Sequence, residues 1–222
     1  VFARHAARRR LRHSASRSTV CPSITLPGTY AEFVAGPGSR LRRELRSDRR
    51  RLANRHQATL LDYGQPGDTD RGVDELARLH QLRTSHVGHP GEFAATKYDA
   101  FHRDVARVMA GRDWILLRVL MIDGVAAAAN YGFLYEGMWY GYQMGFDPGF
   151  EKLSLGASLI DMIIEELIDR GFREADMLRG RSPWKCRWAS GERVNDVHVF
   201  TRGSVGGTIE YLSHILAGRP DI

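Results

Sequence analysis

The stretch that decides the fold runs from Trp139 to Trp188 and reads WYGYQMGFDPGFEKLSLGASLIDMIIEELIDRGFREADMLRGRSPWKCRW. Residues 138–144 are strand-like, and a turn rich in glycine and proline follows at 145–149. Beyond the turn, six apolar side chains between Leu159 and Ile168 recur at i, i+1, i+4, i+5, i+8 and i+9. This spacing places them on one helix face, so we predict a helix over residues 155–170 that packs on a sheet.

Both ends of this helix carry terminal signals. Ser154 is of the type that caps a helix N-terminus, and Gly171 stands where a glycine is favoured after the C-terminus. A second short strand over residues 174–178 leads into the polar segment 179–188. The loop of this strand–loop–helix–strand unit lies at a helix N-terminus, where free backbone N–H groups and the helix dipole favour an anion.

Length and composition limit the class of protein. A chain of 222 residues is expected to form one domain, and an apolar share of 43% suffices for a core. Cys21 and Cys186 are far apart and give neither a disulfide framework nor metal-ligand spacing, which suits a reducing cytosol. Arg118 interrupts the apolar run 114–122, and the run 125–129 is too short to cross a bilayer. We therefore expect a cytoplasmic protein without a transmembrane segment.

The positive charge is concentrated near the N-terminus. Residues 1–55 carry 14 arginines and three acids, a net charge of +11, whereas the other residues carry 18 basic and 23 acidic side chains, a net charge of −5. Residues 1–20 have six arginines and no acid, so we expect disorder there. An unstructured leader is the plain interpretation. The alternatives are an arm for nucleic acid or an anionic surface, and an organellar transit peptide.

A second basic segment precedes the globular part. Leu41, Leu45 and Leu52 recur at i, i+4 and i+11 among arginines, which predicts a surface helix. Its arginines could bind phosphates or form a solvated face. We predict three parts: a disordered basic leader over 1–21, an Arg-rich linking helix over 22–57, and an acyltransferase-like domain, argued below, over 58–222.

The globular part alternates helical and strand-like runs. Expected strands cover 58–63, 114–122, 125–134, 138–144 and 194–201, and expected helices cover 70–84, 98–110 and 208–216. Asp123-Gly124 and Glu136-Gly137 are two-residue turns between apolar runs, so residues 113–145 should form an antiparallel meander. The predicted fold class is α/β, with a mixed, mostly antiparallel sheet flanked by helices. His80, His86, His89 and His102 lack a completing acid or cysteine at motif spacing, so we expect no metal and assign them to polar surface or a substrate cleft.

Four places carry a family resemblance: Leu26-Pro27-Gly28-Thr29 before the Arg-rich helix; Asp123-Gly124-Val125-Ala126-Ala127; Gly145-Phe146-Asp147-Pro148 followed by Leu153-Ser154-Leu155-Gly156; and Asp176-Met177-Leu178-Arg179-Gly180 before Trp184-Lys185 and Trp188. Over about residues 22–200 the chain resembles the cellulose-biosynthesis CelD-like branch of the GNAT acyltransferase superfamily, which is related to FemAB-type peptidyltransferases. Family members are usually longer, with a second GNAT-like half in front. The chain resembles the C-terminal half with its linking helix, so the N-terminal GNAT-like half would be missing.

Two departures bear on the chemistry that the resemblance implies. After Arg-Gly the family usually has two acids and then a tyrosine, where this chain has Arg181, Ser182 and Trp184. The usual pyrophosphate grip, Gln/Arg-x-x-Gly-x-Gly/Ala, is reduced to Gly156 and Ala157 with Lys152 nearby.

The resemblance implies an N-acyltransferase. It would move an acyl group from acyl-CoA, such as acetyl-CoA, to an amine on a small-molecule or glycan-precursor acceptor, for example a sugar or cell-envelope precursor. One alternative is a FemAB-like transferase that uses aminoacyl-tRNA, the one nucleic-acid partner we consider. The other is a truncated, non-catalytic remnant. The candidate catalytic residues are Asp176, Arg179, Lys185 and Tyr142, and the candidate cofactor-binding residues are Gly145, Phe146, Lys152, Ser154, Gly156 and Ala157.

Each candidate side chain has a chemical role and a structural alternative. Asp176 could serve as the base that deprotonates the amine, or could pair with Arg179 or Lys185. Those two cations could neutralise a phosphate or carboxylate, or form a structural salt bridge. Tyr142, which shares a strand face with Tyr140, could protonate the leaving group or simply pack. Cys186 has no evident histidine nearby, which argues against a nucleophilic thiol.

Overall fold

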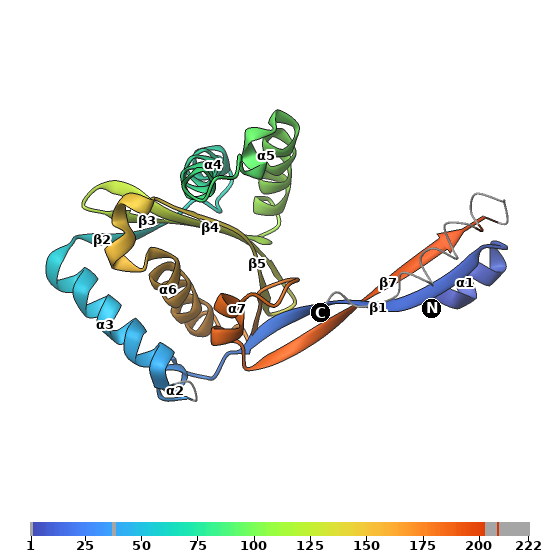
Figure 1. Ribbon diagram of the computed structural model, residues 1–222, viewed down its shortest axis with the longest axis horizontal. Coiled ribbons are helices and arrows are strands. Elements are labelled where there is room, and N and C mark those ends of the chain that lie inside the picture. Colours follow the sequence, from blue (N-terminus) through green and yellow to red (C-terminus); the bar gives the residue numbers. More distant parts are fainter. Residues whose placement is uncertain (1, 37–38, 203–207, 209–222) are drawn as a thin grey trace.

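The computed structural model describes residues 2–36, 39–202 and 208. A seven-stranded sheet in the order β2-β3-β4-β5-β6-β1-β7 is covered by helices on both faces (Figure 1). The strands are β1 (Arg12–Thr25), β2 (Ala58–Asp62), β3 (Ile115–Ile122), β4 (Val125–Tyr135), β5 (Met138–Phe146), β6 (Glu174–Asp176) and β7 (Gly191–Thr201). Every neighbouring pair is antiparallel except β5–β6, so the predicted mixed, mostly antiparallel α/β fold is confirmed.

The predicted meander is confirmed as β3–β4–β5. Its two turns have the positive backbone φ angles of tight hairpin connections: 51° and 81° at Asp123-Gly124, and 49° and 75° at Glu136-Gly137. The apolar side chains of the strands that these turns join lie in two hydrophobic cores, one on each face of the sheet. The third strand, β5, reaches Phe146 and delivers the chain to the beginning of the next helix.

Two helical layers enclose the sheet. The helices are α1 (Phe2–Arg8), α2 (Tyr30–Ala35), α3 (Ser39–Arg55), α4 (Thr69–His86), α5 (Thr96–Ala110), α6 (Leu155–Asp169) and α7 (Pro183–Trp188), with short 3₁₀ helices η1 (Glu92–Ala94) and η2 (Pro148–Leu153). The helices α4 and α5 cover one face, and α3 and α6 cover the other (Figure 1). The apolar stripe of α6 is buried as predicted, and Gly171 follows this helix with a φ of 77°. The terminal helix expected over 208–216 lies outside the described residues, apart from Thr208.

Buried charges fasten the α3–α6 layer to the sheet. Arg118, the charge within β3, is 7% exposed and reaches Asp62 on β2 and Glu166 on α6. Asp161 on α6 is fully buried and accepts hydrogen bonds from the Tyr30 hydroxyl and from Arg49. Burial raises the pKa of Asp161, and its two partners keep the carboxylate satisfied. Arg118 therefore does not interrupt strand β3; it links this strand to β2 and α6.

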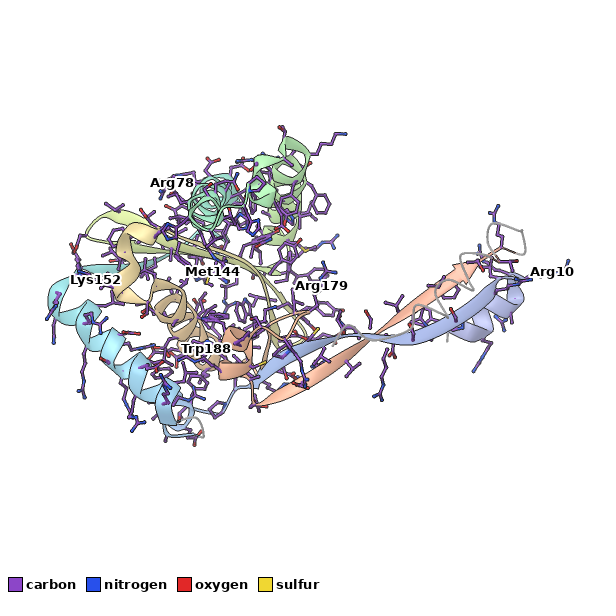
Figure 2. The ribbon with its side chains drawn as sticks, in the orientation of Figure 1. Arg10, Arg78, Met144, Lys152, Arg179 and Trp188 are labelled. Atoms are coloured by element: carbon purple, nitrogen blue, oxygen red, sulfur yellow. The ribbon has the colours of Figure 1, made fainter. Side chains whose placement is uncertain are left out.

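The expected disorder is wrong for residues 2–21. These residues form α1 and most of β1, and β1 pairs with β7 from Arg12 opposite Thr201 to Ser23 opposite Gly191. The two strands extend from the body as a narrow arm, with Arg10 at its outer end (Figures 1 and 2). The partner strand lies more than 160 residues away in sequence, so composition alone misses this pairing. The division of the chain into leader, linking helix and domain stays a prediction.

Candidate functional site

A split in the sheet creates the candidate site. The parallel strands β5 and β6 pair only through three positions, Met138–Tyr140 against Glu174–Asp176. β6 then ends, while β5 continues to Phe146 against β4 alone. Along β5 the register shifts, so that Tyr131 faces Gln143 and Gly132 faces Gly141, which leaves Tyr142 as the extra residue of a bulge. Beyond the end of β6, one edge of β5 has no strand partner. The bulge changes the direction of the β5 side chains at this point.

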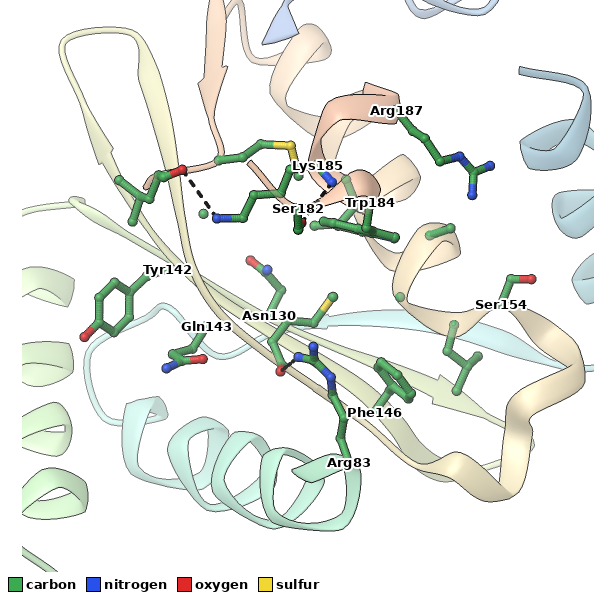
Figure 3. A pocket seen from close by; sticks show the side chains of 18 of the residues that line it. Arg83, Asn130, Tyr142, Gln143, Phe146, Ser154, Ser182, Trp184, Lys185 and Arg187 are labelled. Carbon is green, nitrogen blue, oxygen red and sulfur yellow. Dashed lines mark hydrogen bonds between the residues drawn. The ribbon is translucent and has the colours of Figure 1, made fainter. Parts of the chain in front are cut away.

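A cavity of about 1130 Å³ occupies this split. Its walls come from α3, the C-terminal end of α4, strand β5, the beginning of α6, and the segment after β6 that includes α7. In Figure 3, Gln143, Asn130 and Tyr142 lie on one side of the cavity, with Lys185, Ser182 and Trp184 on the other. A space of this size suits a small molecule or the reactive end of a larger one.

The wall after β6 is built around a strained turn. Leu178 has a φ of 57°, a left-handed value that is unusual for leucine. The carboxylate of Asp176 accepts the Leu178 backbone N–H at 2.7 Å. The Nζ of Lys185 donates to the Leu178 carbonyl at 3.4 Å and to the Arg179 carbonyl at 2.8 Å. Burial raises the pKa of Asp176 and lowers that of Lys185. These two side chains thus hold the turn that presents Arg179 to the cavity.

A chain of hydroxyls lies on the α5 side of the cavity. The Tyr142 hydroxyl is 3.4 Å from the Tyr98 hydroxyl and 3.5 Å from Nε2 of His102. Gln143 Nε2 donates to Tyr98 at 3.1 Å and to Glu92 at 2.5 Å. Burial lowers the pKa of His102, which keeps its imidazole neutral and able to accept a proton. The cavity therefore borders a phenol that is backed by a buried neutral histidine.

Positive charge reaches the cavity from two sides. Arg83 on α4 donates to the Met144 carbonyl at 3.0 Å and lies 5.4 Å from the centroid of the Phe146 ring (Figure 3). Burial lowers the pKa of Arg83. From the opposite wall, Arg179 and Lys185 line the same space. Arg187 also lines it, although this guanidinium is paired with Glu44 on α3.

The start of α6 differs from the prediction. Ser154 precedes the helix as expected, but it has a φ of 49° and its side chain makes no capping hydrogen bond. The Ser154 side chain instead lies close to Asp48 of α3, where it lowers the pKa of that carboxyl against the effect of burial. Asp48 is 8% exposed, and burial raises its pKa. An acidic group therefore stands at the helix end for which the sequence predicted an anion.

The structure brings together seven of the ten residues predicted for the site. The cavity is lined by Tyr142, Phe146, Ser154, Gly156, Ala157, Arg179 and Lys185, and not by Asp176, Gly145 or Lys152. Asp176 stands behind the wall, at its hydrogen bond to Leu178. Gly145 allows close helix packing, since a Cβ there would lie 2.3 Å from the backbone nitrogen of His80. Lys152 is exposed, and its carbonyl accepts a hydrogen bond from Arg51.

Several residues that line the cavity were not predicted from the sequence. For some of them, the surrounding sequence pattern could have indicated a buried polar side chain. Asn130 interrupts the apolar run of β4; it is 3% exposed, and its Oδ1 has no hydrogen-bond partner among the described residues. Asp48 occupies the i+7 position of the stripe formed by Leu41, Leu45 and Leu52, so a carboxylate sits on the buried face of α3. Arg83, Glu92 and Tyr98 gave no such signal, because they reach the cavity only through the packing of α4 and α5.

The histidines fall into two groups. His86 lines the cavity and His89 is exposed, as a cleft or surface assignment requires. That assignment is wrong for His80 and His102, which are 5% and 3% exposed and pack around Phe93. In the described ranges no three His, Cys, Asp or Glu side chains gather as a metal site. A helix both long and apolar enough to span a membrane is likewise absent from those ranges.

The fold and the split-sheet cavity together define a class: α/β domains with a mostly antiparallel sheet that opens between two parallel strands. The chain belongs to the family described as acetyltransferase (GNAT) domain, which matches residues 39–186. A comparison with curated proteins found no match.

Solved structures share the fold at low sequence identity. The C-terminal domain (DUF2156) of a putative lysylphosphatidylglycerol synthetase from Agrobacterium fabrum is similar with a TM-score of 0.59 and 14% identity, over 97% of this chain and 69% of that one. L-PGS from Bacillus licheniformis gives 0.59 and 13%, over 93% and 67%. FemX gives 0.60 and 8%, over 90% of this chain and 64% of FemX. At these identities the likeness concerns the fold alone.

Proposed function

We propose that this GNAT domain is an N-acyltransferase that moves an acyl group from an activated carbonyl donor to an amine. The observation that carries the proposal is the parting of β5 from β6 beside the Tyr142 bulge. An amide-forming reaction needs a carbonyl held beside an amine, donors for the oxyanion, and a proton source for the leaving group. The free edge of β5 supplies backbone N–H groups, and Tyr142 supplies an O–H.

In this mechanism the amine attacks the carbonyl carbon, and the C–N bond forms as the C–S or C–O bond to the donor breaks. A β5 backbone N–H stabilises the oxyanion, and Tyr142 protonates the departing sulfur or oxygen. Glu92, beside Gln143, or a water chain takes the proton of the amine. That proton returns to Tyr142 through Tyr98 or His102, so the starting protonation states are restored. Asp176 acts indirectly here, because it holds the Leu178 turn.

The donor and acceptor follow from the resemblance to the CelD-like branch. The donor is acyl-CoA, such as acetyl-CoA, and the acceptor is the amine of a sugar or cell-envelope precursor, with the reaction placed in the cytoplasm. Arg83, Arg179 and Lys185 would neutralise the phosphates of the donor.

Two further candidates remain open to test. Aminoacyl-tRNA as donor is favoured by the fold likeness to FemX and L-PGS, and either phosphate-rich donor suits the cavity cations. A non-catalytic role is favoured by Arg181 and Ser182 where the family has acids, and by the position of Asp176 behind the wall.

The test measures acyl transfer to amines from acyl-CoA and from aminoacyl-tRNA. Tyr142→Phe should lower kcat by about 100-fold with little change in KM, as expected for a lost proton donor. Tyr140→Phe is the matched control, since its hydroxyl faces the sulfur of Met138 on the same strand. Asp176→Asn should retain activity, because the amide oxygen still accepts the Leu178 N–H.

Each outcome assigns a role. Wild-type kcat in Tyr142→Phe would remove the phenol from the mechanism. A large loss in Asp176→Asn would restore Asp176 as the base. If the wild type transfers no acyl group from either donor, the non-catalytic role is the correct one.

A further inference from the structure

The N-terminus of α6 is open toward the cavity but is already matched by a negative charge. Gly156 and Ala157 of its first turn line the cavity. The Ala157 N–H donates to the Ser154 carbonyl at 2.9 Å, whereas the N–H groups of the first two helical residues, Leu155 and Gly156, have no carbonyl partner within the helix. Such an end ordinarily favours a phosphate. Here Asp48 also lines the cavity, together with Ser154, the residue before the helix. The Asp48 carboxylate therefore compensates the positive end of the α6 dipole.

Asp48 is fixed in this position by its surroundings. It lies on the buried stripe of α3, between Leu45 and Leu52, which are 2% and 3% exposed. Its ion-pair partner, Arg51, is one helical turn away with an Nη1–Oδ1 distance of 3.6 Å. Because that ion pair is long, Arg51 compensates the Asp48 carboxylate only weakly toward the helix end. A phosphate placed there would meet a like charge in a partly desolvated setting.

Cations without a carboxylate partner lie elsewhere in the cavity. Arg83 donates to a backbone carbonyl and Lys185 donates to two, and within the described ranges neither forms an ion pair with a carboxylate. Arg179 lines the cavity beside Lys185. Other acids also line the cavity, but each has a partner: Glu44 pairs with Arg187, Glu92 accepts from Gln143, and Asp147 accepts the Gly149 N–H. Asp48 is the carboxylate at the start of α6, whereas Arg83, Arg179 and Lys185 lie at the end of α4 and after β6.

We propose that Asp48 is a specificity-determining residue that excludes phosphate groups from the N-terminus of α6 and directs the anionic part of the donor to Arg83, Arg179 and Lys185. This deepens, and rests on, the proposed acyl transfer. Donors that need a pyrophosphate at the α6 end are disfavoured, and donors whose phosphates lie on the opposite side are accepted. The Asp48 carboxylate thus selects among donors by repulsion, without contacting the reacting carbonyl.

The test measures whether removal of the Asp48 charge increases the affinity for ligands that carry phosphate groups. Asp48→Asn keeps the size and shape of the side chain and removes its charge. Isothermal titration with inorganic pyrophosphate and with coenzyme A should show at least about 10-fold tighter binding to Asp48→Asn than to the wild type. Equal or weaker binding in the variant, including no binding to either protein, overturns the proposal. Asp48→Ala repeats the comparison if the asparagine variant does not fold.

Matched controls locate the effect. Glu92→Gln removes a carboxylate on the α5 side of the cavity and should not bring the same gain. The double variant Asp48→Asn/Arg51→Gln should keep the gain; its loss would assign the effect to a freed Arg51 and overturn the proposal. In the Asp48→Asn background, Gly156→Leu should abolish the gain, whereas Arg83→Gln should leave it in place.

Binding separates this proposal from the proposed function. If Asp48→Asn gains pyrophosphate affinity while no acyl transfer is detected, the exclusion by Asp48 stands and the acyl-transfer activity fails. If acyl transfer is detected but Asp48→Asn gains nothing, the reverse holds.

Discussion

Several buried polar atoms on the α4–α5 side of the sheet have no hydrogen-bond partner among the described residues. Three of them belong to ring side chains: Nδ1 of His80, Nδ1 of His102 and the hydroxyl of Tyr131. The pKa of His80 and that of His102 are both lowered by burial, so both imidazoles are neutral in the folded chain. Each ring packs on Phe93, and His102 also contacts Tyr131 and Tyr142. Packing therefore contributes strongly to holding these rings, and Nε2 of His102 adds the 3.5 Å contact with the Tyr142 hydroxyl.

This burial predicts a pH-dependent stability. The folded pKa of each histidine lies below the unfolded value of about 6.5, so the unfolded chain binds protons first as the pH falls. Stability is therefore fully present above that pH and is lost as the pH drops toward the folded pKa. Urea denaturation at pH 7.5 and pH 5.5 should show a smaller loss in His102→Phe than in the wild type. Lowering a pKa by one unit corresponds to about 1.4 kcal/mol.

The control is a histidine outside the core. His89→Gln, in an exposed loop, should keep the wild-type pH dependence. An unchanged slope in His102→Phe would show that burial of this imidazole does not couple folding to protonation.

At the scale of elements, the close approach of α4 to β5 depends on Gly145. A Cβ at that position would lie 2.3 Å from the backbone nitrogen of His80 and 2.5 Å from the carbonyl carbon of Leu79. Because both are backbone atoms, no side-chain rotation can relieve the contact. The helix must shift, and with it Arg83, which reaches the cavity from the next turn.

Gly145→Ala should therefore destabilise the fold by about 1–3 kcal/mol, the range for overpacked positions. Chemical denaturation gives the free energy of unfolding, and ligand titration reports the displaced Arg83. Gly111→Ala is the matched control, since its φ is −63° and the nearest atom to an added Cβ is 3.7 Å away. A Gly145→Ala protein as stable as this control would show that α4 is not held so closely.

Local sequence patterns predicted some elements and not others. The meander and α6 were predictable, because alternating apolar runs, Asp-Gly and Glu-Gly turns, and a helical stripe each specify structure within a few residues. The pairing of β1 with β6 and β7 was not, since its partners lie about 150 to 190 residues along the chain. The site divides in the same way. The turn and helix at 145–157 were found, whereas Arg83 and Asp48 depend on how α4 and α3 pack.

At the scale of the molecule, the arm and the body differ in burial. The inner residues of β1, Cys21 to Ile24, are buried, and Ser23 to Thr25 also pair with β6. The outer residues, 12–17, pair with β7 alone. An isolated two-stranded ribbon is marginally stable in water, whereas a strand inside a sheet is not. The inner half of β1 is therefore stabilised by the sheet, whereas its outer half is an exposed two-stranded ribbon with β7.

Hydrogen exchange should follow this division. Amides of residues 21–25 should exchange through the opening of the body, and those of residues 12–17 much faster, with protection lower by at least about 100-fold. Exchange measured by mass spectrometry on peptides covering each half of β1 checks this. Equal protection in the two halves would mean that the arm is stabilised by contacts beyond β7. Val119, buried in β3, supplies the reference for opening of the body.

The position of β1 between β6 and β7 also constrains how the protein is made. Within this chain β1 is synthesised before its neighbours β6 and β7, which begin only at Glu174 and Gly191. While the residues between them are made, the meander and its helices can assemble, and β1 waits with both edges open. Strands β6 and β7 then close the sheet around β1, so the split that holds the cavity takes its final width only after these strands have been made.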